Sequence, residues 1–599
     1  MQLLPRNISM EPRITKRERK LHLSYELPHR IHTAHIYPVT APNGSTVVVY
    51  GHARGLRVLW RGGRRRKQQA ARGNADDSSS IDDVYEAEEE EQDTDCPFPG
   101  IIQDLDIELG NGDRPHGAMR VAVPSMNPSA VPVKLLQTTA IVAVGSTDGS
   151  ISVLSIPLAL PTDEEKDQLL QEIAESTVKL QDSGPTPADL AIKYLAAEQL
   201  PISTRATEGV DGHLFIAGVS RVLHIWSLEV TGDVILALSD DQLLRRAPLP
   251  VMGRKVRFHP SPRLAQLLVT DTSGAARIYD PYASTSPRRR PGSSDSMLSH
   301  QTIPAGTGKW VMAYLTPFYI DEKNVHANAA FAQRKSILDA RWALSGKAVL
   351  VLLEDGEWGL WDIASVPTGK RVEDFAIRGF LGTAGHTEAA EPNTRRKGSS
   401  KLAPMTPNTR KAKAEQLFSG APKIPGVAPQ GGISVAAHHN RTGPGDESAV
   451  IWYNSDIYSI NSLQSFYQRS TSNSGGLGSL YSPGLTHITD VNLFCESITS
   501  ISQFRSTSSS AGIGQMNTQR DLLISAEYRA VILQALRTKT PARRPLFQQQ
   551  LAERAPVDRD QRMLDAGMLD IDGMDRMLDN MADAPAAVGR RVGFAAALG

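Results

Sequence analysis

The chain has 599 residues, 40% of them hydrophobic, and its 65 basic and 65 acidic side chains give a formal net charge of zero. A protein without excess positive charge has no whole-molecule electrostatic attraction to nucleic acid. The two cysteines, Cys96 and Cys495, form neither a disulfide framework nor a zinc-ligand spacing. The basic segment 1–20 lacks the apolar stretch of a secretory signal, and no run of about 18 apolar residues follows, so we expect a protein of the cytoplasm or nucleus.

A strand–turn–strand pattern begins after the basic segment. Its first copy runs from Val47–Tyr50 through the turn Gly51–Gly55 to Leu56–Trp60, so that the second strand ends in an aromatic residue. Short β-branched runs separated by Gly, Asp or Ser are typical of the hairpins in a propeller blade. The pattern occurs seven times, over residues 47–60, 140–154, 213–227, 256–280, 337–363, 433–460 and 498–536.

The phase of the aromatic residue favours a propeller over other all-β folds. It recurs at the same place in four copies, at Trp60, Trp226, Tyr279 and Trp361, and Trp361-Asp362 is the pair that names WD repeats. Arg257–Pro260 (Arg-Phe-His-Pro) is also a phrase that opens WD blades. The sequence therefore predicts an all-β fold, a seven-bladed WD-repeat β-propeller over residues 21–540, with a tail at 541–599.

Four insertions are predicted to interrupt the propeller, at 61–95, 162–200, 281–300 and 364–430. The first joins a basic block to an acidic run, and we expect a solvated, disordered loop with a docking site for a basic partner as the alternative. In the second, Leu169, Leu170, Ile173 and Val178 fit one face of a short helix on the propeller rim. The last two are rich in Ser, Pro and basic residues and are predicted to be disordered.

Basic clusters and kinase-like positions lie in these loops and near the tail. Arg395–Lys397 and Arg410–Lys413 could serve nuclear import or contact nucleic acid nonspecifically. Three possible phosphosites each precede a proline: Ser286, Thr406 and Thr540. At Ser286 and Thr540 a basic residue follows shortly after the proline. A phosphate there would offset local positive charge and could release a bound partner.

The tail repeats a small apolar–acidic unit of Met, Leu and Asp. Such a segment suits a helix that lies in a groove of a partner protein, although it could also fold back on the propeller. The candidate partner-binding residues are Met563, Leu564, Met568, Leu569, Met577 and Leu578.

Catalytic and metal-binding patterns are not found. Gly306–Lys309 lacks the spacing of a phosphate-binding loop, and Gly145–Gly149 lacks the nucleophile elbow. His438 and His439 are adjacent, so in a strand they point to opposite faces and cannot share a metal. We therefore expect no enzyme activity, no cofactor and no metal.

The first 160 residues carry a resemblance. Leu27–His32, Ala41–Thr46, Tyr50–His52, Leu59–Gly63 and Ile101–Asp106 are similar to phrases in the first blade of a filamentous-fungal propeller family, the nucleoporin 37 family. The resemblance implies a scaffold subunit of the Y-shaped outer-ring complex of the nuclear pore, with a role in mRNA and protein transport. It implies that the propeller docks by its rim on a larger α-solenoid nucleoporin at the nuclear envelope, with no membrane insertion and no direct nucleic-acid contact.

Two other functions remain open at this point. One is a WD-repeat subunit of a nucleolar ribosome-assembly complex, which would explain the basic clusters and is distinguished by its location. The other is a substrate adaptor whose propeller reads a peptide, which predicts a ring of arginines and aromatic residues around the central channel.

Overall fold

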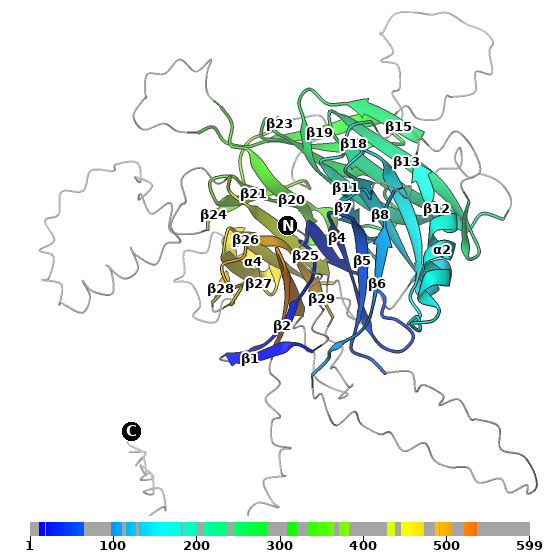
Figure 1. Cartoon of the computed structure of the whole chain (residues 1–599). Coiled ribbons are helices and arrows are strands. Elements are labelled where there is room, and N and C mark those ends of the chain that lie inside the picture. Colours follow the sequence, from blue (N-terminus) through cyan, green and yellow to red (C-terminus); the bar gives the residue numbers. More distant parts are fainter. Residues whose placement is uncertain are drawn as a thin grey trace, which may run out of the picture. The chain divides into compact units, whose positions relative to one another are not determined.

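The computed structural model shows seven four- or five-stranded antiparallel sheets arranged around one axis (Figure 1). It describes residues 11–535 apart from 18–19, 65–97, 111–114, 127–130, 181–183, 201–208, 237–242, 284–307, 320–332, 365–370, 382–427, 438–444, 472–484, 490 and 506–519. The predicted seven-bladed propeller is confirmed. Each of the seven predicted hairpins lies in a different blade.

The first three blades follow the chain in order, and each innermost strand comes first. Blade 1 holds β3 (Thr33–Ile36), β4 (Thr46–His52), β5 (Gly55–Arg61) and β6 (Ile101–Glu108). Blade 2 holds β7 (Ala118–Ala122), β8 (Thr139–Ser146), β9 (Ile151–Pro157) and β10 (Val178–Leu180). Blade 3 holds β11 (Asp189–Ala196), β12 (Gly212–Val219), β13 (Val222–Thr231), β14 (Val234–Leu236) and β15 (Leu243–Pro248).

The next three blades repeat this arrangement. Blade 4 holds β16 (Gly253–Phe258), β17 (Leu267–Asp271), β18 (Ala275–Asp280), β19 (Lys309–Leu315) and β23 (Arg371–Val372), the last paired parallel to β19. Blade 5 holds β20 (Ile337–Ala343), β21 (Ala348–Leu353), β22 (Glu357–Asp362) and β24 (Ile377–Phe380). Blade 6 holds β25 (Gly431–Ala437), β26 (Glu447–Tyr453), β27 (Asp456–Ile460) and β28 (Thr486–Ile488).

Blade 7 is built from both ends of the described chain. Its inner strands are β29 (Ile498–Phe504), β30 (Asp521–Ala526) and β31 (Arg529–Ala535), and its outer strands are β2 (Lys20–Glu26) and β1 (Arg13–Arg17). The register of β2 on β31 runs from Lys20 opposite Ala535 to Glu26 opposite Arg529. This pairing closes the ring, because it holds an early strand against the last described one.

The core lies between neighbouring blades. The third strand carries the predicted large aromatic residue in blades 1, 3, 4 and 5, and Trp60, Trp226 and Trp361 are completely buried. Trp60 belongs to the cluster between blades 1 and 2, and Trp361 to the cluster between blades 4 and 5. The preceding blade covers one face of a sheet and the next blade covers the other, so the middle strands are apolar on both sides, as in β21, which is buried throughout.

The part of the chain that the structure describes has few helices, and they are short. They are α1 (Leu135–Thr138), α2 (Lys166–Ser176), α4 (Leu463–Thr471) and the 3-10 turns η1 (Ala197–Gln199) and η4 (Leu344–Gly346). The amphipathic segment does form a helix, α2, which buries Ile173 against the cluster between blades 1 and 2. Within the described residues, no helix is long and apolar enough to cross a membrane.

Residues 162–200, predicted as an insertion, also contribute two blade strands. After α2 they form β10, the outer strand of blade 2, and β11, the inner strand of blade 3. The helical period of 169–178 drew the prediction away from the strand at Asp189–Ala196, although the Gly and Pro residues within 182–187 are a turn signal before it. Similarly, β1 lies in the basic segment 1–20, and β23 and β24 lie in the insertion 364–430.

Candidate interaction surface

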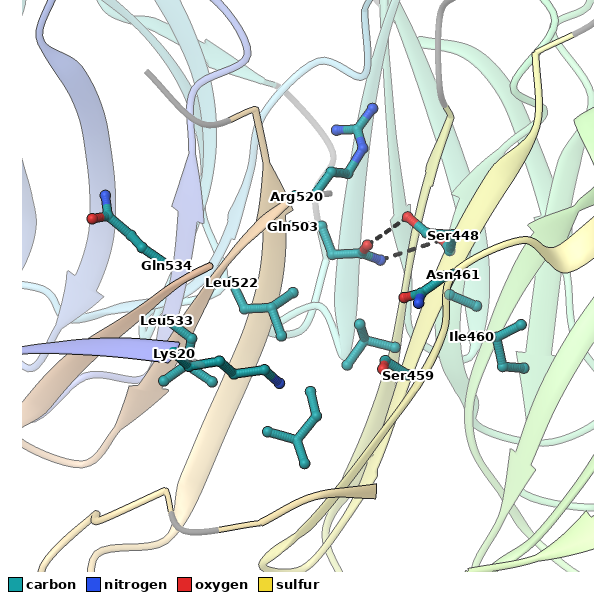
Figure 2. A pocket seen from close by; sticks show the side chains of 13 residues that line it. Lys20, Ser448, Ser459, Ile460, Asn461, Gln503, Arg520, Leu522, Leu533 and Gln534 are labelled. Carbon is teal, nitrogen blue, oxygen red and sulfur yellow. Dashed lines mark hydrogen bonds between the residues drawn. The ribbon is translucent and has the colours of Figure 1, made fainter. Parts of the chain in front are cut away.

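One cavity of about 250 Å³ opens between blades 6 and 7 (Figure 2). Gln503 of β29 crosses it, accepting a hydrogen bond from the Ser448 hydroxyl (2.7 Å) and donating to the Ser434 carbonyl (2.7 Å). Lys20 and Arg520 add positive charge, and the remaining lining is mixed apolar and amide. Among the residues that line it there are two serine hydroxyls, but no histidine and no carboxylate.

Charged side chains on the inner strands are paired with one another. Asp189 accepts hydrogen bonds from the Val256 amide (3.1 Å) and from the Arg257 guanidinium. Burial alone would raise the pKa of Asp189, but the positive charges around it, Arg257 first, hold that pKa below its ordinary value. Asp339 accepts the Ile433 amide at 2.9 Å and lies 3.4 Å from Arg341. Arg257 thus joins blade 4 to blade 3, and Arg341, which donates to the Ile433 carbonyl at 3.0 Å, joins blade 5 to blade 6.

A second polar cluster joins the Leu27–His32 segment to blade 1. His52 lies with Nε2 2.9 Å from Asp106 Oδ1, and its Nδ1 accepts the Arg54 amide at 3.3 Å. The rings of His29 and His52 stack with centroids 4.3 Å apart. Three of the phrases that carry the family resemblance therefore meet here, although they are far apart in sequence.

An arginine completes this cluster. His29, His52 and Asp106 could each offer one ligand atom, and these atoms lie within 4.8 Å of one another. However, Arg57 donates to Nδ1 of His29 at 3.2 Å and lies 3.5 Å from Asp106, so a guanidinium already supplies the positive charge. Burial lowers the pKa of His29, which keeps its ring neutral and able to accept that bond.

Exposed apolar side chains gather on one face of the propeller. We call it the loop face, because it carries the connections from each outermost strand to the next blade and the turns between second and third strands. Ten large apolar side chains are exposed within the described part of the chain, and only Val234 and Leu264 lie at the opposite face. The other eight are Ile14, Val251, Met252, Phe318, Tyr319, Phe380, Phe494 and Tyr528.

The first concentration is the blade 5 patch, formed by Phe318, Tyr319 and Phe380. Their side chains are 40%, 42% and 52% exposed. The Arg334 guanidinium lies 4.1 Å from the centre of the Phe318 ring, and the Lys335 Nζ lies 5.6 Å from that of Phe380. Aromatic residues flanked by arginine are the composition that protein–protein interfaces favour.

Lys335 is fixed at the centre of this patch. Its ammonium lies 2.7 Å from Asp355 and 2.5 Å from Glu357, the latter on the strand that pairs with Phe380. Burial alone would lower the pKa of Lys335, but the two carboxylates raise it above its ordinary value. The polar groups beneath the aromatic side chains are thus satisfied within the protein, which leaves the rings free to face a partner.

The second concentration is the blade 7 patch, formed by Ile14, Phe494 and Tyr528. Arg529 and Arg13 place their guanidinium carbons 4.3 Å and 5.2 Å from the Phe494 ring centre. The Phe494 side chain is 44% exposed. Its backbone has φ of 52°, in the left-handed region that disfavours residues with a Cβ. Such strain persists only where surrounding contacts impose it, and it is found often at binding sites.

None of the site residues predicted from the sequence falls in the part of the chain that the structure describes. The tail residues Met563, Leu564, Met568, Leu569, Met577 and Leu578 lie outside it, as do Ser286, Thr406 and Thr540. The two loop-face patches were not predicted. Their one sequence signal is that Phe318 and Phe494 stand in connections between blades, outside the alternating strands that account for the buried aromatic residues.

Comparison with known proteins identifies the family. The model of the nucleoporin NUP37 N-terminal domain matches residues 24–533. A protein of Chaetomium thermophilum named nucleoporin NUP37 is 28% identical over 507 residues, covering 74% of this chain, and the match spans 65% of that relative's length. Nucleoporins reside in the nuclear pore complex, so the predicted location at the nuclear envelope is confirmed. Because the family model covers most of the propeller, from β2 to β31, the chain belongs to the nucleoporin NUP37 family.

Proposed function

We propose that the chain is a non-catalytic scaffold subunit of the outer-ring, Y-shaped complex of the nuclear pore, and that its propeller docks on a larger α-solenoid nucleoporin. The observation that carries the docking is the blade 5 patch, three aromatic side chains that are each at least 40% exposed on one face. Single exposed apolar residues are ordinary, whereas a group of them on a polar base marks a contact surface.

An α-solenoid fits this patch. Its stacked helices present grooves between neighbouring helices, which accept aromatic side chains. Because Arg334 and Lys335 are already paired with carboxylates of this chain, the aromatic rings themselves would make the contact. Two features support a non-catalytic role: membership in a nucleoporin family and a cavity whose lining has no acid–base pair.

The test is the triple variant Phe318→Ala, Tyr319→Ala, Phe380→Ala in the full chain, tagged at the amino terminus and expressed in living cells. We expect the nuclear-rim signal and the recovery of outer-ring nucleoporins on purification to fall at least about tenfold, because several interface hot spots are removed together. The thermal midpoint should stay near that of the wild type, since the three side chains are exposed.

The matched control is Val234→Ala with Leu264→Ala, which removes exposed apolar groups from the opposite face. It should retain the rim signal. A triple variant that still binds outer-ring nucleoporins at wild-type level would contradict docking through blade 5. A nucleolar signal with pre-ribosomal proteins from the wild-type chain would contradict the pore function itself.

The tail and the phosphosites are a further part of this proposal. Met563, Leu564, Met568, Leu569, Met577 and Leu578 would bind a groove of a second subunit, and phosphate at Ser286, Thr406 or Thr540 would weaken contacts made by the basic residues nearby. Replacing the six tail residues by serine should reduce recovery of one subunit while the rim signal persists. Loss of every subunit at once would contradict the proposal that the tail binds one subunit and the propeller another.

A further inference from the structure

Strand β1 leaves one edge of the propeller open. It is the outermost strand of the five-stranded blade 7 sheet, whose order is β1-β2-β31-β30-β29, and no strand within the described residues pairs with its outer edge (Figure 1). All five of its residues are exposed. The alternate amides and carbonyls of such an edge are available to pair with another extended chain.

The charge on this edge selects its partner. Arg13–Arg17 contains three cations, Arg13, Lys16 and Arg17, and no carboxylate. Two copies of the chain that paired antiparallel through β1 would bring Arg13 opposite Arg17, and like charges directly opposite are destabilising. An acidic strand would instead meet a cation at most positions.

The blade 7 patch lies at one end of this edge. Arg13, the first residue of β1, reaches the Phe494 ring, and Arg529 covers that ring from the next strand but one. An extended peptide on β1 would thus run onto an exposed aromatic anchor. Peptides that add to a sheet use this combination, in which the backbone pairing provides affinity and a side-chain contact provides specificity.

We propose that β1 and the blade 7 patch form a docking site for an acidic, extended segment of a partner protein, which adds to blade 7 as a sixth strand. The site differs from the blade 5 patch and does not depend on α-solenoid docking. A membrane surface is disfavoured as the occupant, because lipids have no extended backbone that could pair with the amides and carbonyls of the β1 edge.

The test measures binding of a fluorescein-labelled nine-residue peptide of alternating valine and glutamate to the full chain by anisotropy, with hydrogen exchange as a second readout. We expect saturable binding and slower amide exchange across residues 13–17. The same peptide with its three central amides N-methylated should lose binding, because neither of its edges can then pair. The valine–lysine analogue should bind at least about tenfold more weakly, because its charge is reversed.

Two variants locate the site. Arg13→Glu with Lys16→Glu should weaken binding of the acidic peptide about tenfold, and Phe494→Ala should weaken it several-fold by removing the anchor. The N-methylation result is obtained with the wild-type chain, so it holds even if a variant misfolds.

Four outcomes would overturn the proposal. The N-methylated peptide could bind as well as its parent, or the lysine peptide as well as the glutamate peptide. Phosphatidylserine vesicles could bind in place of the peptide and lose binding in the Arg13→Glu, Lys16→Glu variant, which would assign the edge to a membrane. A dimer that this variant dissociates would assign the edge to a second copy. Each outcome leaves the α-solenoid docking untouched, so the two proposals fail separately.

Discussion

Blades 5 and 7 differ in how their strands are brought together and in how each blade is joined to the next one. Blade 5 forms from one stretch, Ile337–Phe380, whose first three strands are joined by short turns, whereas blade 7 joins β2 to β31 across nearly the whole chain. At the junction to the next blade, blade 5 uses a carboxylate, Asp339, and blade 7 uses a hydroxyl, Ser500, which bonds both the amide and the carbonyl of Ala34 at 3.2 Å. The two blades therefore differ in how they are connected and in whether a charged or a neutral side chain bonds to the next blade.

The largest effect is expected from the core of blade 5. Trp361 is completely buried, with its ring 4.8 Å from that of Phe375 and 5.4 Å from that of Tyr314. Trp361→Ala should lower the free energy of unfolding by about 3–5 kcal/mol, measured by urea denaturation, because it removes buried area and leaves a cavity. Phe380→Ala, on an exposed side chain of the same blade, is the control and should change it little. Equal losses for the two variants would contradict the assignment of Trp361 to the core.

The residues behind this prediction also show how far the sequence alone reaches. The strand pair Val349–Leu353 and Trp358–Asp362 was predicted correctly because a continuous apolar run, turn residues and an aromatic residue all occur within about 15 residues. The closing strand β2 was not identified as a partner of β31, since no local signal connects residues so distant. The exposure of Phe318 and Phe494 was also unpredictable, because neighbouring blades decide which aromatic side chains remain uncovered.

The closure of blade 7 should respond differently to a similar deletion. Leu23 of β2 is completely buried and lies opposite Ile532, so Leu23→Ala should lower the free energy of unfolding by about 2–4 kcal/mol. Leu350→Ala is the matched change in blade 5, where the side chain is equally buried. Hydrogen exchange should distinguish them. In Leu23→Ala, the amides of residues 20–26 should exchange well before those of the rest of the chain. In Leu350→Ala, exchange should become faster throughout blade 5. The same uniform increase in exchange in both variants would contradict the idea that β2 can open separately.

Acid should loosen the junction after blade 5 more than the junction after blade 7. Burial alone would raise the pKa of Asp339, but Arg341 and other positive charges hold that pKa below its ordinary value. Because its pKa is lower in the folded than in the unfolded chain, its stabilising contribution is present above pH about 4 and is lost as the pH falls further.

Asp339→Asn should therefore cost about 1–3 kcal/mol at neutral pH, and the difference from the wild type should shrink towards pH about 2. Ser500→Ala should cost about 1 kcal/mol at every pH, since a hydroxyl does not titrate in this range. Urea denaturation of both variants from pH 7 downwards measures this. A pH-independent loss for Asp339→Asn would mean that the carboxylate charge contributes nothing to the junction.

The smallest effects concern the left-handed residues beside each patch. Blade 5 places a glycine in this conformation, Gly356 with φ of 87°, and a Cβ there would lie 2.8 Å from the Leu381 carbonyl oxygen. Blade 7 instead places Phe494 and the exposed Cys495 there, the latter with φ of 65°. Gly356→Ala should therefore destabilise the chain by about 1 kcal/mol or more, whereas Cys495→Gly should stabilise it by up to about 1 kcal/mol. Thermal unfolding of both, with Cys495→Ala as the control for loss of the thiol, provides the measurement. Destabilisation by Cys495→Gly would show that the backbone at Phe494 is held without strain, and the argument for a preformed blade 7 patch would then rest on the arginines alone.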